Sequence, residues 1–143
     1  MSANTRPAVS FWIIAVLAVL WNAFGVFSFY YHVTATPDVV ATWPDVQQRI
    51  AAVTPSWIFV PFAIATIGGL LGSLGLLLRR RWAVPVLLVS LLAIVVQFSS
   101  YYLLTPTWAL TGAGGAALPL CIALVGLFLW WYARRAAARG WLR

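Results

Sequence analysis

The sequence has 143 residues, of which 64% are hydrophobic and only 8% are charged, and its mean hydropathy is +0.96. A soluble domain cannot bury so large an apolar fraction, so the composition predicts a membrane protein. The net charge of +7 comes from arginines; they lie at the ends of apolar segments and not along one polar face, which argues against nucleic-acid binding.

The first apolar segment covers residues 11–31. A helix that crosses a membrane needs about 20 such residues, whereas the apolar core of a signal peptide has only about 7–15. We therefore expect a first span that stays in the protein. At about 100° per residue, Asn22, Gly25, Phe29 and His32 fall on one side of this helix, with Asn22 near mid-membrane and His32, the only histidine, just beyond the outer end.

The connection at residues 34–55 is the largest segment predicted outside the membrane. Apolar residues recur at helical spacing between positions 46 and 53, which predicts a short amphipathic helix lying on the membrane surface. Thr42 and Asp45 have the spacing of a capping box, so we expect them at the start of that helix.

The second predicted span, residues 57–78, carries two faces of small residues. One face holds Gly68, Gly72 and Gly75, and the other holds Ala65, Gly69 and Ser73. Small residues spaced in this way let helix backbones approach closely. The segment is therefore expected to have two close neighbours, either both within the chain or one of them a partner protein.

The third and fourth predicted spans are residues 82–104 and 113–132. Ser90, Gln97 and Tyr101 fall on one side of the third helix. The predicted fold is all-α, a polytopic membrane protein built as an up-down-up-down bundle of four transmembrane helices in one domain. In such a bundle the first and third helices are diagonal, so both polar stripes can face the bundle axis.

Two interpretations of these polar residues remain open. They can form hydrogen bonds between helices, each of which stabilises the contact by about 0.6–2 kcal/mol. Alternatively, Asn22, Ser90, Gln97, Tyr101 and His32 line a polar crevice that opens outward, with the aspartates of the first outer loop at its mouth.

Arginine asymmetry predicts the orientation. Eight arginines would lie on one side of a four-span protein, namely Arg6, Arg79, Arg80, Arg81, Arg134, Arg135, Arg139 and Arg143. Only Arg49 falls on the other side. The positive-inside rule then places both termini in the cytoplasm, with the chain in a bacterial inner membrane.

Several of these arginines are also predicted to contact anionic lipid headgroups. They are Arg79, Arg80, Arg81, Arg134, Arg135 and Arg139. The tail at residues 133–143 is expected to continue the fourth helix past the membrane, with Trp141 turning back toward it.

Missing residue types exclude many chemistries. The sequence has no lysine for a Schiff base, and one cysteine and one histidine cannot form a disulfide, a cysteine zinc site or an HExxH site. We expect no enzymatic activity, no metal and no resident cofactor, but bound lipid. In an alternative, His32 is the axial ligand of a haem or chlorin.

Three stretches carry a resemblance: "LWNAFGVFSFYY", "GGLLGSLGLLLRRRWAVPVLLVSLL" and "WWYARR". Together they resemble a group of small four-span bacterial inner-membrane proteins that are often labelled sugar transporters. The resemblance implies transport but no residue-level mechanism, so no site residue follows from it.

Three functions fit the sequence. The first is a non-catalytic accessory or assembly subunit of a larger respiratory or photosynthetic membrane complex, whose partners would be other membrane subunits or further copies of the chain. The second is an oligomeric carrier or channel for a small, sugar-like solute. The third is a membrane protein that binds a pigment or a lipid.

Overall fold

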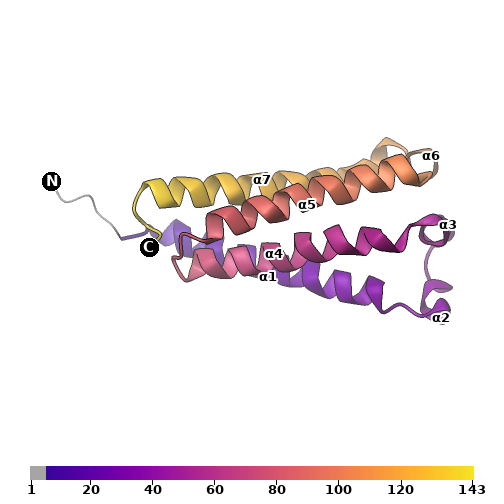
Figure 1. Ribbon diagram of the computed structural model, residues 1–143, viewed down its shortest axis with the longest axis horizontal. Coiled ribbons are helices and arrows are strands. Elements are labelled where there is room, and N and C mark those ends of the chain that lie inside the picture. The colour runs from indigo at the N-terminus through magenta and orange to yellow at the C-terminus, as the bar shows by residue number, and fades with distance from the viewer. Residues whose placement is uncertain (1–5) are drawn as a thin grey trace.

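The computed structural model describes residues 6–143, and every regular element in that range is helical. Four long helices run side by side along the longest axis of the molecule (Figure 1). They are α1 (Val9–Val33), α4 (Phe59–Leu77), α5 (Ala83–Leu104) and α7 (Ala117–Ala138). The start of α1 and the C-terminus lie at one end of the molecule, which we name the terminal end (Figure 1).

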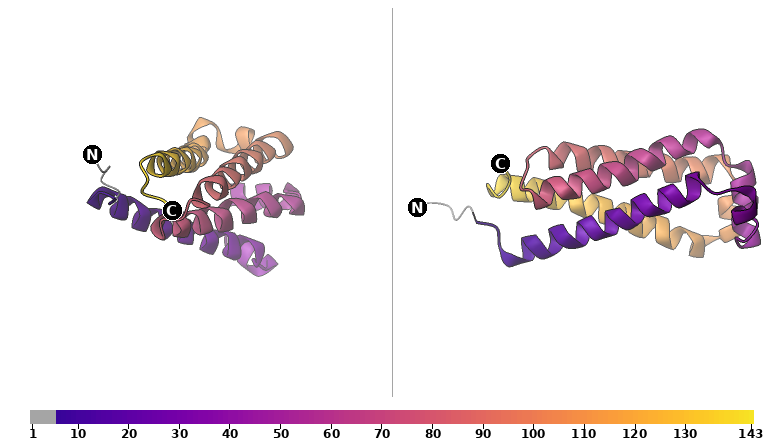
Figure 2. Two further views of the ribbon diagram at one scale, coloured as in Figure 1. Left: turned by 60° about the vertical axis from the view of Figure 1, so that its left-hand side comes forward. Right: turned by 90° about the horizontal axis from the view of Figure 1, so that it is seen from below.

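Short helices occupy the opposite end, which we name the loop end (Figures 1 and 2). They are α2 (Pro37–Val40), α3 (Asp45–Val53), η1 (Ser56–Ile58), α6 (Thr107–Thr111) and η2 (Ala113–Ala116). The short helix predicted between the first two spans is confirmed as α3, and its place on the membrane surface stays a prediction. The predicted capping box is wrong, because Pro44 is the N-cap residue and Thr42 Oγ1 donates instead to Val39 O at 2.6 Å.

Four helical segments are long and apolar enough to cross a membrane, and they overlap the four predicted spans. They are Val9–Val33, Ser56–Leu77, Ala83–Leu104 and Ala113–Ala138. The first helix extends past Tyr31, so His32 lies within its last turn and not beyond it. The last helix continues through Arg134 and Arg135, since arginine is a good helix former and suits a helix C-terminus.

Helix α4 lies at the centre of the packing. It packs against α1 on one side and α5 on the other, and α5 in turn packs against α7. Helices α1 and α7 do not pack along their length. They approach each other at the terminal end, where the Phe11 ring stacks on Tyr132 and meets Trp141 edge to face, with ring centroids 6.3 and 5.8 Å apart.

The main hydrophobic core also lies at the terminal end. Its fully buried members include Phe11, Ala15, Leu76, Ala83, Ala133 and Leu142. A second, smaller cluster of Ala65, Ala93 and Ile94 lies further along the helices. The packed interior is therefore concentrated near the termini.

The arginine turn between α4 and α5 binds the end of the chain, which the sequence did not predict. Arg79 has a φ of 59°, and the Arg80 N–H donates to Gly75 O at 2.7 Å, which closes α4 with a Schellman motif. Arg79 Nε then donates to Trp141 O at 2.7 Å, and the Arg143 N–H donates to Arg79 O at 2.6 Å. We name residues 79–81 together with 141–143 the arginine clasp.

The two small-residue faces of α4 both have their neighbour within the chain. Gly68, Gly72 and Gly75 face α5, where the nearest side chains are those of Ser90, Leu87 and Trp82. Gly69 lies against both Asn22 of α1 and Ser90 of α5. Ser73 accepts a hydrogen bond from Asn22, and the Ala65 carbonyl accepts one from Ser90.

We predict opposite responses to alanine at two of these glycines. A Cβ at position 72 would lie 2.6 Å from Leu87 Cγ, whereas one at position 68 would lie 3.4 Å from Ser90 Cβ, an ordinary contact. Overpacking should make Gly72→Ala less stable by about 1–3 kcal/mol. Gly68→Ala should be neutral or more stable, because alanine favours a helix over glycine by up to about 1 kcal/mol.

Unfolding of both variants in detergent micelles, followed by circular dichroism, checks this difference. Equal effects of the two substitutions would show that α4 and α5 do not approach as closely as described.

Candidate ligand cavity

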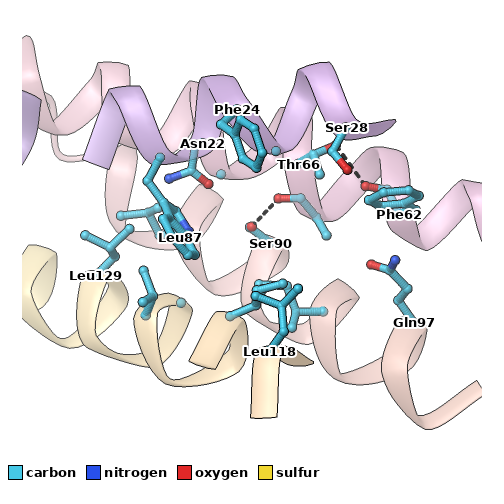
Figure 3. A pocket seen from close by; sticks show the side chains of 18 residues that line it. Asn22, Phe24, Ser28, Phe62, Thr66, Leu87, Ser90, Gln97, Leu118 and Leu129 are labelled. Carbon is cyan, nitrogen blue, oxygen red and sulfur yellow. Dashed lines mark hydrogen bonds between the residues drawn. The ribbon is translucent and has the colours of Figure 1, made fainter. Parts of the chain in front are cut away.

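A cavity of about 170 Å³ lies between the four long helices (Figure 3). We name it the deep chamber. Its walls are mainly apolar, with Phe24 from α1, Leu87 from α5, and Leu118 and Leu129 from α7. Leu87 and Leu129, which border its end toward the termini, belong to the main hydrophobic core.

Most polar side chains in this region are bonded to neighbouring helices or to their own helix. Asn22 Nδ2 donates to Ala18 O at 2.9 Å and to Ser73 Oγ at 3.0 Å. Ser90 Oγ donates to Ala65 O at 2.6 Å (Figure 3). These bonds tie α4 to α1 and to α5, as the hydrogen-bond interpretation of the sequence expects.

Gln97 differs from these residues. Its side chain is only 5% exposed, yet no hydrogen bond joins its amide to any of residues 6–143. Every inaccessible side-chain nitrogen or oxygen atom in residues 6–143 has a hydrogen-bond partner. The Gln97 amide has none, so its nitrogen and oxygen must be accessible at the cavity surface. Figure 3 shows the amide projecting from α5 toward Phe62 of α4.

A larger cavity of about 510 Å³ lies at the loop end. We name it the outer chamber. Its walls include several aromatic rings, among them His32, Trp43, Phe98, Tyr101 and Tyr102. Phe62, Gln97 and Leu118 line both chambers, so the two cavities adjoin at these three residues.

His32 is held by its own helix and by surrounding rings. Nδ1–H donates to Ser28 O at 2.7 Å, since a carbonyl can only accept, and Nε2 makes no hydrogen bond within residues 6–143. The rings of Trp43 and Phe62 lie with centroids 5.3 and 6.0 Å from that of His32. Coordination of a haem or chlorin by His32 stays a prediction.

The chamber walls contain no arginine, aspartate or glutamate. Asp38 and Asp45, which were expected at the mouth of a crevice, line neither chamber. Across the described residues, no group of three or more histidine, cysteine or acidic side chains could hold a metal ion. What the walls offer is apolar surface, aromatic rings and a few neutral hydrogen-bonding groups.

The structure brings the predicted polar residues onto the two chambers in order. Asn22, Ser90 and Gln97 line the deep chamber, while Gln97, Tyr101 and His32 line the outer one. The contribution of α7 was missed, because its wall residues are apolar and carry no polar stripe. The aromatic wall was also missed, although the clustering of rings near the loop end was visible in the sequence.

The predicted lipid-contacting arginines have contacts within the protein. Arg81 Nε donates to Leu142 O at 3.3 Å, as part of the arginine clasp. The guanidinium groups of Arg134, Arg135 and Arg139 lie 5.0, 5.4 and 5.1 Å from the centres of the Trp130, Trp131 and Trp141 rings, respectively. Contact with anionic headgroups stays a prediction for all six.

No known protein family, curated protein or solved structure shows significant similarity to this chain.

We predict that Asn22 and Gln97 contribute differently to stability. Asn22→Leu keeps the side-chain shape but removes two hydrogen bonds, so it should lower the free energy of unfolding by about 1–2 kcal/mol. Gln97→Met keeps the length but removes an amide without a partner, so stability should be unchanged or higher.

Thermal unfolding of the two variants in detergent micelles measures the difference. If Gln97→Met is destabilised as strongly as Asn22→Leu, the Gln97 amide is a structural contact and not a free group in a cavity.

Proposed function

We propose that the chain is a non-catalytic integral membrane protein that binds a small uncharged molecule in the two chambers. The unbonded Gln97 amide at their junction is the observation that carries this proposal. A ligand that pairs with the amide would form a hydrogen bond that no group of residues 6–143 provides.

The shape and chemistry of the cavities support binding. Small-molecule sites have volumes of about 300–1,000 Å³, mostly apolar and aromatic walls, and a few polar groups that orient the ligand. The outer chamber, at about 510 Å³, falls within this range. The absence of charged groups from the walls of both chambers favours an uncharged ligand, because a buried charge without a partner is costly.

The proposal includes a transmembrane orientation. The chain would cross a bacterial inner membrane as an up-down-up-down bundle, with the terminal end in the cytoplasm and the loop end outside. The arginine clasp and Arg134, Arg135 and Arg139 all belong to the terminal end, whereas Arg49 belongs to α3 at the loop end. This distribution is the one that the positive-inside rule favours for a cytoplasmic terminal end.

Reporter fusions test the orientation. A fluorescent protein fused after Arg143 should fold and fluoresce, because the terminal end lies in the cytoplasm, and alkaline phosphatase at the same position should be inactive. Phosphatase inserted between α2 and α3 should be active. The reverse pattern would place the chambers on the cytoplasmic side.

A second candidate function is favoured by the exposure of α7. Only 6% of the most apolar stretch of this helix is buried, and Leu120, Leu124 and Leu127 are all exposed. Lipid can cover such a face, and so can a neighbouring membrane subunit. A place as an accessory subunit of a larger complex is compatible with ligand binding, since Leu120, Leu124 and Leu127 line neither chamber.

Native mass spectrometry of the purified protein tests both functions at once. We expect wild-type protein to retain a bound small molecule and Gln97→Met to retain less of it. Ser100→Ala is a matched control on α5: its hydroxyl donates to Val96 O and it lines neither chamber, so this variant should keep the ligand.

Wild-type protein with empty chambers, or Gln97→Met that retains as much ligand as wild type, would contradict the binding function. Additional subunits in the same spectrum would support the second candidate.

A further inference from the structure

We propose that the ligand is a neutral amphiphile dissolved in the membrane, with a planar ring that carries carbonyl groups, as in a quinone, and an apolar tail. It enters sideways from the lipid between α1 and α7. This inference rests on the proposed binding function and specifies the ligand class and the route of entry.

The route follows from the packing of the long helices. Helix α1 packs against α4 and α7 packs against α5, but α1 and α7 do not pack on each other along their length. Three residues on these two helices line the deep chamber and are also exposed on the outside: Trp21 is 40% exposed, Phe24 is 70% and Leu118 is 63%. The deep chamber therefore opens through apolar side chains toward the surface that hydrocarbon would cover.

The deep chamber suits the start of an apolar tail. Its volume of about 170 Å³ is close to that of an engineered apolar cavity of about 150 Å³ that binds benzene in another protein. Because the chamber is apolar and bordered by the exposed residues of α1 and α7, a longer chain can continue from it into the lipid.

The outer chamber suits a planar head. Phe62, Phe98 and Tyr102 provide aromatic walls on which a ring can pack. The Gln97 amide offers N–H donors at the junction of the chambers, and these match the carbonyl oxygens of a quinone. Tyr101 also lines this chamber and carries a hydroxyl that can donate.

The chemistry of the walls separates this ligand from others. An anionic lipid headgroup would be buried without a cationic partner, because neither chamber is lined by arginine. A sugar has hydroxyl groups all around its ring, and most of them would lie unbonded against Leu118 and the aromatic walls. A neutral ring with carbonyl groups at its edge leaves its faces free for apolar contact.

The side-chain amide signals of glutamine give a direct test, because the sequence contains only three glutamines, Gln47, Gln48 and Gln97. The protein is reconstituted in nanodiscs of zwitterionic lipid with nitrogen-15 glutamine. Four probes are titrated separately: a decyl-substituted benzoquinone, decanol, decanoate and glucose. Gln48 serves as an internal control, since its amide is already bonded to Ala41 O and Trp43 O at 3.2 and 2.7 Å.

We expect the quinone alone to shift the Gln97 amide signals saturably while those of Gln48 stay unchanged. Binding of the quinone should also raise the melting temperature of wild type and of Ser100→Ala. For Gln97→Met, the affinity inferred from this stabilisation should fall about tenfold, since a lost hydrogen bond of about 1.4 kcal/mol corresponds to that factor.

Other outcomes overturn the inference in distinguishable ways. An equal saturable shift with decanol removes the need for a ring, and one with decanoate removes the requirement for neutrality. A shift with glucose alone would mean that the ligand comes from water and not from the lipid. If none of the four probes shifts Gln97, the ligand class is wrong; if wild-type protein also carries no small molecule in native mass spectra, the binding function fails as well.

Discussion

The close contact of α4 with both α1 and α5 is the constraint on which the rest of the structure depends. Gly69 has no side chain, and the side chains of Asn22 from α1 and Ser90 from α5 occupy the space that a Cβ at this position would need. Asn22 and Ser90 can therefore reach across to Ser73 Oγ and the Ala65 carbonyl. Hydrocarbon chains cannot donate or accept hydrogen bonds, so each of these polar groups needs a partner within the protein.

This contact also determines where the molecule is tight and where it is hollow. Toward the termini, the arginine clasp and the core around Phe11 and Leu76 hold the ends of the four long helices together. Toward the loop end, the α1–α4 and α5–α7 pairs separate (Figure 1), and the chambers occupy the interior there. The molecule is packed at the terminal end and hollow toward the loop end because the ends of the four long helices are held together only at the terminal end.

Much of the fold follows from simple sequence features, and what was missed has physical causes. Long apolar segments predict the four spans, and small residues at helical spacing predict two close neighbours of α4, because both features reflect short-range physics. The arginine clasp depends on contacts between positions about 62 residues apart, such as Arg79 with Trp141, and on a left-handed backbone at an arginine where glycine is usual. Neither the long-range contacts nor the left-handed backbone at Arg79 follows from a periodic pattern in the sequence. The polar stripes of the first and third helices were found, but only the structure separates the bonded amide of Asn22 from the unbonded one of Gln97.

The difference between the bonded Asn22 amide and the unbonded Gln97 amide concerns function as well as stability. An apolar residue at position 97 would lack the desolvation cost of an amide that has no partner among residues 6–143. Functional sites are where proteins depart from local rules of stability. Asn22 and Gln97 have similar chemistry on helices of similar hydropathy, yet one amide closes a helix contact and the other faces a cavity. The contrast between these two amides, within one apolar interior, is the strongest physical reason to regard the chambers as a binding site and not as a packing defect.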